Sequence, residues 1–266
     1  RWACGATLPA SVLVSCVLFF QAIFYLQLLS IPIGLLSAGG VIIVMSVLME
    51  LAGRWLYVAP LHAATVENIK TTDASSPPSR EPMRWQHWAL LATCIGLFAL
   101  LMVRLFALPL SGDDTVCRWE RRGVTLHELG NFTYYPPTEP EHYRVYFFTD
   151  AIPPMIQFAY FWVYESFGAD APRASTLFVG LQVVCLAMLA YAITHAYTKS
   201  RTAGLLTVLL LASSQLFLWA VAMGQETGMT ALAFAGVYYF LHWGSASGQR
   251  TRAVVLAGFA AAAGAL

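Results

Sequence analysis

Long apolar runs, each about the length of one membrane crossing, are the feature that most constrains this chain. A helix needs about 20 apolar residues to cross a hydrocarbon core roughly 30 Å thick. Lipid offers no hydrogen-bond partners to backbone N–H and C=O groups, and the alternating pattern of a strand is absent. Each run therefore predicts a helix. Six runs qualify, at residues 10–29, 31–51, 87–110, 174–196, 203–222 and 227–243, and a seventh begins near residue 253.

The low content of charged residues also indicates that lipid surrounds most of the chain. Only 11% of the residues are charged and 58% are hydrophobic, whereas a soluble domain carries about 25% charged residues. The net charge of +1 comes without a basic stripe, so nucleic acid is not an expected partner. The five cysteines form no C-x-x-C pair, and we expect neither a disulfide framework nor a zinc site.

Two polar stretches divide this all-α polytopic membrane protein into three expected parts. Residues 1–53 form an N-terminal transmembrane hairpin, and residues 54–86, which contain S-S-P-P-S, form a cytoplasmic linker. Residues 87–266 form a partial membrane core, whose extracytoplasmic loop at 111–172 holds nine of the fourteen acids. The chain starts without Met and stops inside an apolar run, so we expect a piece of a longer protein.

The apolar segment 153–167 (PPMIQFAYFWVYESF) leaves two alternatives open. As a helix it reaches about 22 Å, which is short of a full crossing, so it is either a short span or an interfacial helix. Positively charged loops favour the cytoplasmic side. If the segment does not cross the membrane, the loops that carry most of the Lys and Arg residues lie on one side, as this rule expects. We therefore favour the interfacial helix. The loop 111–172 and the turn at 224–226 are then extracytoplasmic.

Three acids lie where a predicted membrane helix meets water. Asp113 and Asp114 directly follow the third run, where a lipid-linked substrate would present its head group, and one would act as a general base. The alternative is a hydrated turn, for which S-G-D-D is well suited. Glu226 lies in a short turn between two helices, where an ionisable group is costly and often functional. Its alternative is a solvated turn residue.

Basic residues near the same boundary are candidate contacts for a phosphate. Arg104 lies inside the third run and either snorkels to the head groups or contacts a phosphate near the acidic pair. Arg173 begins the fourth run, as an interface anchor or as a phosphate ligand. Arg144 and His142 are weaker candidates in the outer loop.

The order of these features forms a pattern across residues 87–266. The acidic pair follows a membrane helix, a Pro-Pro segment runs into Phe-Gly, and A-P-R-A-S-T-L-F-V-G-L comes next. A small basic turn then precedes L-L-L-A-S-S-Q-L-F-L-W-A-V-A-M-G-Q-E-T-G-M-T-A-L-A-F. This order resembles the GT-C superfamily of membrane glycosyltransferases, in particular the branch of bacterial lipid A aminoarabinose transferases and protein O-mannosyltransferases.

The resemblance implies a GT-C-type transmembrane helix bundle with a catalytic acid in its first outer loop, the place that Asp113 and Asp114 fill. Glu226 matches a second acid of the family in position but not in identity, since the family usually has Asp there. Arg173 matches an Arg after the Pro-Pro segment. Ile152 is a departure, because the family commonly has His or Lys at that place.

The activity implied is transfer of a sugar from a polyprenyl-phosphate donor to a hydroxyl of a lipid, glycan or protein at the extracytoplasmic face. The expected location is the bacterial inner (plasma) membrane, with membrane lipids around the chain. No cofactor is required, although an acidic pair would also suit a divalent metal. The alternatives are a transporter or lipid flippase, which would place polar groups near the bilayer midplane, and a non-catalytic membrane scaffold.

Overall fold

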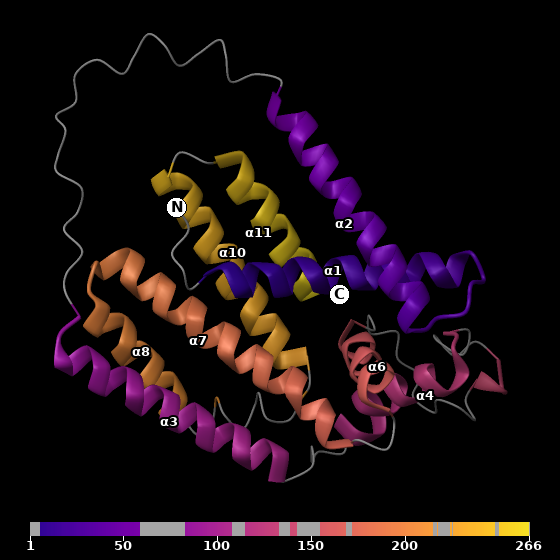
Figure 1. The fold of residues 1–266 in the computed structure, drawn as a ribbon, viewed down its shortest axis with the longest axis horizontal. Helices are drawn as coiled ribbons and strands as arrows, with labels where there is room; N and C mark the ends of the chain where they lie inside the picture. The colour runs from indigo at the N-terminus through magenta and orange to yellow at the C-terminus, as the bar shows by residue number, and fades with distance from the viewer. Residues whose placement is uncertain are drawn as a thin grey trace.

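The computed structural model is helical throughout the part of the chain that it describes (Figure 1). That part comprises residues 6–58, 83–107, 115–132, 139–142, 155–168, 172–214, 217, 224, 226–247 and 250–265. It contains no strand, which confirms the all-α class. In order the elements are α1 (Thr7–Leu28), α2 (Leu35–Val58), α3 (Trp85–Ala107), the π-helix η2 (Thr115–Glu120), α4 (Arg121–Leu129), α6 (Met155–Phe167), the 3₁₀-helix η3 (Pro172–Ser175), α7 (Thr176–Thr198), α8 (Arg201–Ser213), α10 (Glu226–Ser247) and α11 (Arg250–Ala265).

Within these ranges, three helices are long and apolar enough to cross a membrane. They are α1, α3 and α7, with mean hydropathies of 2.0, 2.3 and 2.2. The segment Leu35–Leu51 of α2 and the whole of α8 are apolar but shorter. The first, third and fourth apolar runs are therefore confirmed as helices of spanning length. The second run is also helical, and α2 continues to Val58, beyond the predicted start of the linker.

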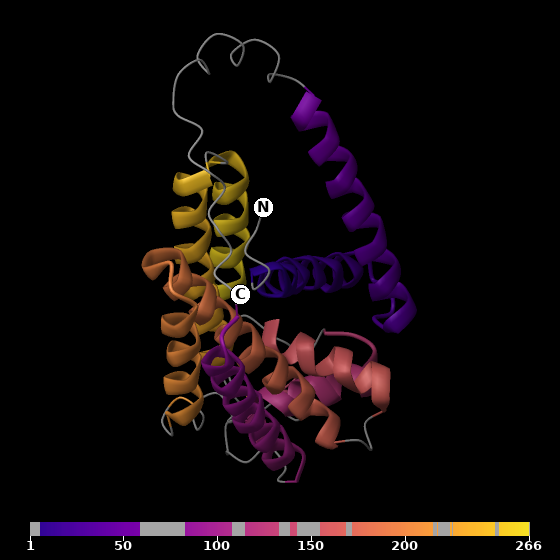
Figure 2. The same cartoon turned by 60° about the vertical axis from the view of Figure 1, so that its left-hand side comes forward.

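The helices α3, α7, α8 and α10 meet at their ends. At one end, His87 Nε2 lies 3.0 Å from Thr202 Oγ1, which joins the starts of α3 and α8. At the same end the ring of Tyr197 stacks on that of His242, with centroids 4.3 Å apart, which joins the ends of α7 and α10. The short helices α4 and α6 lie at the opposite end, which we call the α4/α6 end (Figures 1 and 2). The starts of α3 and α8 and the ends of α7 and α10 therefore lie at one end of these helices.

Small residues bring α10 and α11 into close contact. A Cβ added to Gly244 would lie 2.1 Å from the Cβ of Ala253. Helices in lipid commonly associate through such small residues because their backbones can approach closely. α1 runs across this pair (Figure 1), and a Cβ added to Gly236 would lie 2.7 Å from Cδ1 of Leu13. The first helix of the predicted hairpin therefore belongs to the same hydrophobic core as α7 and α10.

α6 is short and is buried by other helices. Its 13 residues are too few to cross a membrane, and it stays beside α4 at the α4/α6 end (Figure 1). The sequence favoured a helix lying on the membrane surface with one apolar face. The structure packs α6 against α4, α1 and η2, because apolar side chains lie on most of its sides and not on one face alone. Its buried residues are Met155, Ile156, Gln157, Phe158, Tyr160, Phe161, Val163 and Tyr164.

The two ends of the bundle give a direct test of orientation. In a variant whose native cysteines are replaced by serine, we predict that Glu128→Cys reacts with a membrane-impermeant maleimide added to sealed cells. Lys199→Cys should react only after the membrane is permeabilised, because Glu128 lies on α4 and Lys199 follows α7 at the opposite end. Equal labelling of both cysteines in sealed cells would contradict this arrangement.

Candidate functional site

Two tyrosines of α6 make polar contacts at the α4/α6 end. The Tyr164 hydroxyl donates a hydrogen bond to Oε1 of Glu120, the last residue of η2. The Tyr160 hydroxyl donates to the carbonyl oxygen of Gly224, shortly before α10. The tyrosines are one helical turn apart, so they lie on the same side of α6. This side of α6 therefore connects η2 with the turn before α10.

The environment of these tyrosines keeps both hydroxyls protonated. Burial raises the pKa of Tyr160 well above its ordinary value, and the nearby Glu120 and Tyr164 raise it further. Burial also raises the pKa of Tyr164, as does its hydrogen bond to Glu120, while a hydrogen bond from the Ser175 side chain acts in the opposite direction. Both side chains are thus hydrogen-bond donors throughout the physiological pH range.

A buried arginine lies on α4, the helix that packs against α6. Arg122, the second residue of α4, has no solvent-exposed surface and is the largest side chain of which this is true among the described residues. Gln157 of α6 is also fully buried, and the two helices pack on each other. A guanidinium presents a planar array of donors that suits phosphate and carboxylate groups. The α4/α6 end therefore contains a buried cation near Glu120.

The chain neighbours of three predicted site residues meet at α6. Thr115, the residue after Asp114, begins η2, whose Glu120 accepts from Tyr164. Arg173 lies in η3, which ends at Ser175, the other hydrogen-bond partner of Tyr164. Gly224, two residues before Glu226, accepts from Tyr160. We call Glu120, Tyr160, Tyr164, Ser175 and Gly224 the α6 polar cluster.

The other predicted site residues divide into two groups. Asp113, Asp114 and Arg144 lie outside the described residues, as does the side chain of Arg173, of which the structure gives the backbone. The remaining three, Glu226, Arg104 and His142, are described with their side chains and do not join the cluster.

The described positions of these three residues fit their simpler alternatives. Glu226 is exposed and is the first residue of α10, where a carboxylate is stabilised by the helix dipole. Arg104 is exposed in the last turn of α3, which suits a side chain that extends toward head groups. His142 Nδ1 accepts the backbone N–H of Glu139 at 3.3 Å, within a local turn.

Sequence reasoning missed the residues of the α6 polar cluster. The sequence offers no local signal that singles out Arg122, and it predicts the α6 segment only as a single apolar piece. The spacing of Tyr160 and Tyr164 by four residues was a signal, since it places two hydroxyls on one side of a helix. The partners Glu120 and Gly224 had no such signal, because they are 44 and 64 residues away from these tyrosines.

The turn between α1 and α2 docks onto the same layer. The Phe132 N–H donates to Oε1 of Gln27 at 2.8 Å, and the Ile33 N–H donates to the carbonyl of Gly130 at 2.8 Å. Gln27 lies in the last turn of α1 and Ile33 in the turn that follows, so the two contacts join the end of α1 and this turn to the residues after α4. The N-terminal helix pair therefore holds the residues after α4 in place.

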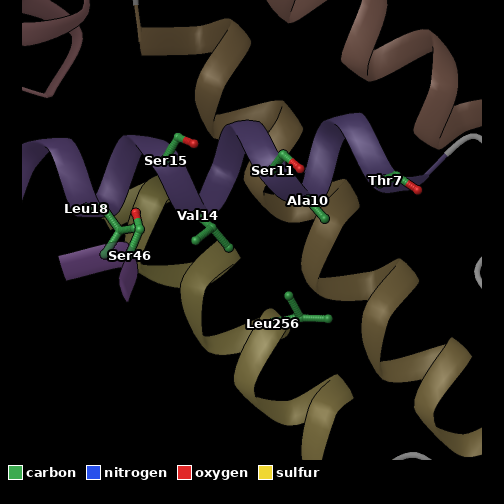
Figure 3. A pocket seen from close by; sticks show the side chains of 8 residues that line it. All are labelled: Thr7, Ala10, Ser11, Val14, Ser15, Leu18, Ser46 and Leu256. Atoms are coloured by element: carbon green, nitrogen blue, oxygen red, sulfur yellow. The ribbon is translucent and has the colours of Figure 1, made fainter. Parts of the chain in front are cut away.

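A groove of about 480 Å³ lies elsewhere, between α1, α2 and α11 (Figure 3). Hydroxyl groups recur along one side of α1 at this groove, beside apolar side chains. The lining contains no ionisable side chain, so the groove offers neither an acid nor a base. Its lining residues are Thr7, Ala10, Ser11, Val14, Ser15, Leu18, Ser46 and Leu256.

Other described parts of the chain offer little that could bind a metal. Among the described residues, no three His, Cys, Asp or Glu side chains gather closely enough to hold a metal ion.

No protein-family model, no curated protein and no solved structure matches this chain. The α6 polar cluster and the chain segments that it joins are the candidate site.

The Tyr160 hydrogen bond gives a stability test of the cluster. We predict that Tyr160→Phe lowers the free energy of unfolding by roughly 1–3 kcal/mol, because the carbonyl of Gly224 loses its buried donor. Thermal unfolding of the detergent-purified protein measures this change. Tyr25→Phe is the matched control, since Tyr25 is 46% exposed. The cluster would be contradicted if both variants unfolded at the same temperature as the unchanged protein.

Proposed function

We propose that this protein is an integral membrane glycosyltransferase of the GT-C type, which transfers a sugar from a polyprenyl-phosphate donor to an acceptor hydroxyl at the extracytoplasmic membrane face. The observation that supports it best is the meeting of three chain segments at α6. Along the chain, Glu120 of the α6 polar cluster follows Asp114 by six residues, Ser175 follows Arg173 by two, and Gly224 precedes Glu226 by two. Acids and a cation near one another are what such a transfer needs.

The position of the cluster suits a donor that cannot leave the bilayer. The spanning helix α3 has one end beside η3, and the spanning helix α7 has one end beside η3 and α6. A polyprenyl tail would lie in the membrane beside such helices, and its phosphate would lie at their ends. The sugar would then be presented to the acids from the membrane side, at the boundary between lipid and water.

The reaction requires a proton acceptor and a cation. A base takes the proton from the acceptor hydroxyl as its oxygen attacks the anomeric carbon of the sugar, and the polyprenyl phosphate leaves with the bonding electrons. Asp113 or Asp114 is the base that the sequence predicts. Arg173, with Arg104, Arg144 or His142 as further candidates, would stabilise the negative charge on the departing phosphate. Arg122 adds a cation that the sequence did not suggest.

Transport is the competing function, and one observation favours it. Gln182 is fully buried in α7, and neither polar atom of its amide has a hydrogen-bond partner among the described residues. A polar path through the membrane would need such groups. The other buried polar side chains of α1, α3 and α7 are His87 and Thr176, which lie near helix starts. One isolated amide gives weaker support than the polar cluster gives to chemistry at the surface.

Neutralising the acidic pair tests the proposed transfer. We predict that Asp113→Asn combined with Asp114→Asn abolishes the transfer of label from radiolabelled polyprenyl-phosphate hexoses and pentoses to an acceptor in native membranes. Membrane insertion and thermal stability should be unchanged, because the substitutions alter charge and hardly alter size. Glu128→Gln combined with Glu141→Gln is the matched control, since it removes two exposed acids from the same loop.

Three outcomes separate the alternatives. Transfer by the control variant and none by the Asp pair variant would support the assignment. Undiminished transfer by the Asp pair variant would refute the role of the pair. An unchanged protein that moves labelled donor across the membrane of a sealed vesicle, and releases no transferred product, would favour the transporter.

A further inference from the structure

Glu165 connects three helices at the α4/α6 end. It lies in the last turn of α6, and its Oε1 is 2.6 Å from Nδ1 of His127 on α4. Its Oε2 accepts the backbone N–H of Leu35, the first residue of α2, at 3.0 Å. A carboxylate at a helix N-terminus is stabilised by the free N–H groups and by the helix dipole. Both oxygens of Glu165 are therefore held in defined positions.

These contacts fix the orientation of the His127 ring. In a neutral imidazole one nitrogen carries the hydrogen and the other carries a lone pair. With Nδ1 beside a carboxylate, the hydrogen resides on Nδ1 and is donated to Glu165, so the lone pair is on Nε2. Nε2 has no partner among the described residues, and the side chain is 27% exposed. His127 therefore presents a proton-accepting nitrogen to its surroundings.

If His127 and Glu165 served only to hold the helices together, the imidazole would not be required. The contact between Glu165 and Leu35 already attaches α2 to α6, and the contacts of Phe132 and Ile33 attach the end of α1 and the turn before α2 to the residues after α4. A partly exposed histidine that is oriented by a carboxylate through one nitrogen, with no partner on the other among the described residues, is the arrangement of a general base.

The pair of His127 and Glu165 lies on the same two helices, α4 and α6, that position the α6 polar cluster. Glu165 directly follows Tyr164 on α6. His127 follows Glu120 by seven residues along η2 and α4, which corresponds to roughly 10 Å along a helix. A sugar and its acceptor span distances of this order, so both features can contact one bound pair of substrates.

We propose that His127, oriented by Glu165, is the base that deprotonates the acceptor hydroxyl, an inference that rests on the proposed glycosyltransferase function. The hydroxyl oxygen forms a bond to the anomeric carbon, and the bond from that carbon to the phosphate oxygen breaks. The electron pair of the broken bond stays on the polyprenyl phosphate, and the hydroxyl proton moves to Nε2 of His127. His127 thus takes the role of base that the sequence predicts for Asp113 or Asp114. The Asp pair then accepts hydrogen bonds from the hydroxyls of the donor sugar, so its neutralisation still abolishes transfer, and Glu165 is a positioning residue.

Two substitutions of His127 separate a base from a clamp. His127→Asn keeps an N–H close to the place of Nδ1 and removes Nε2, so we expect unchanged thermal stability and a loss of transfer of about 100-fold or more. His127→Ala leaves space at a partly exposed position, so added free imidazole should restore transfer to this variant and not to His127→Asn. A clamp would show no such rescue.

The matched control is His195→Ala, which removes an imidazole at the opposite end of the bundle, where it stacks on Tyr191. Its transfer should equal that of the unchanged protein and should not respond to imidazole. The assay uses the full chain in native membranes with radiolabelled polyprenyl-phosphate sugars, and rates are normalised to folded protein.

Failure of the inference is distinguishable from failure of the proposed function. If the unchanged protein transfers sugar and His127→Asn transfers it equally fast, His127 is not the base and the glycosyltransferase function stands. The same conclusion follows if both His127 variants lose transfer and imidazole restores neither. If the unchanged protein transfers no sugar from any donor, the proposed function is wrong and the role of His127 is wrong with it.

Discussion

α4 touches the backbone of α6 because residue 123 has no side chain. A Cβ added to Gly123 would lie 2.6 Å from the Cβ of Tyr160, and 3.0 Å from both the carbonyl oxygen of Gln157 and the nitrogen of Phe161. This contact sets the distance between the two helices. It places Arg122 and Leu126 of α4 in full burial and brings Tyr160 and Tyr164 to their partners. The candidate site therefore depends on this crossing.

α6 connects elements that are far apart in the sequence. On one side its tyrosines reach Glu120 and Gly224, and at its last turn Glu165 reaches His127 and the start of α2. A helix too short to cross the membrane thus joins α1 and α2, the segment formed by η2 and α4, and the turn before α10. Chemistry at a membrane surface needs such a rigid support, because reacting groups must be held at fixed distances.

The sequence predicts the helices well and their contacts poorly, for physical reasons. Apolar runs of spanning length identify α1, α3 and α7, because a backbone in lipid must form all of its hydrogen bonds internally, as a helix does. The burial of Arg122 depends instead on the close helix contact that Gly123 allows, and no local sequence pattern predicts this burial. The pair of His127 and Glu165 is separated by 38 residues. Asp113, Asp114 and Arg144 lie outside the described residues, so their roles and the GT-C resemblance stay predictions.

Gly→Ala substitutions at two helices test the crossing of α4 and α6 most directly. Gly123→Ala should lower the free energy of unfolding in detergent by roughly 1–3 kcal/mol, because the added methyl group overpacks the contact with Tyr160. Gly96→Ala in α3 should raise it by up to about 1 kcal/mol, since a Cβ there meets nothing within 4 Å and alanine favours a helix. Opposite changes in melting temperature are the expected result. An equal rise in both variants would contradict the close approach of α4 to α6.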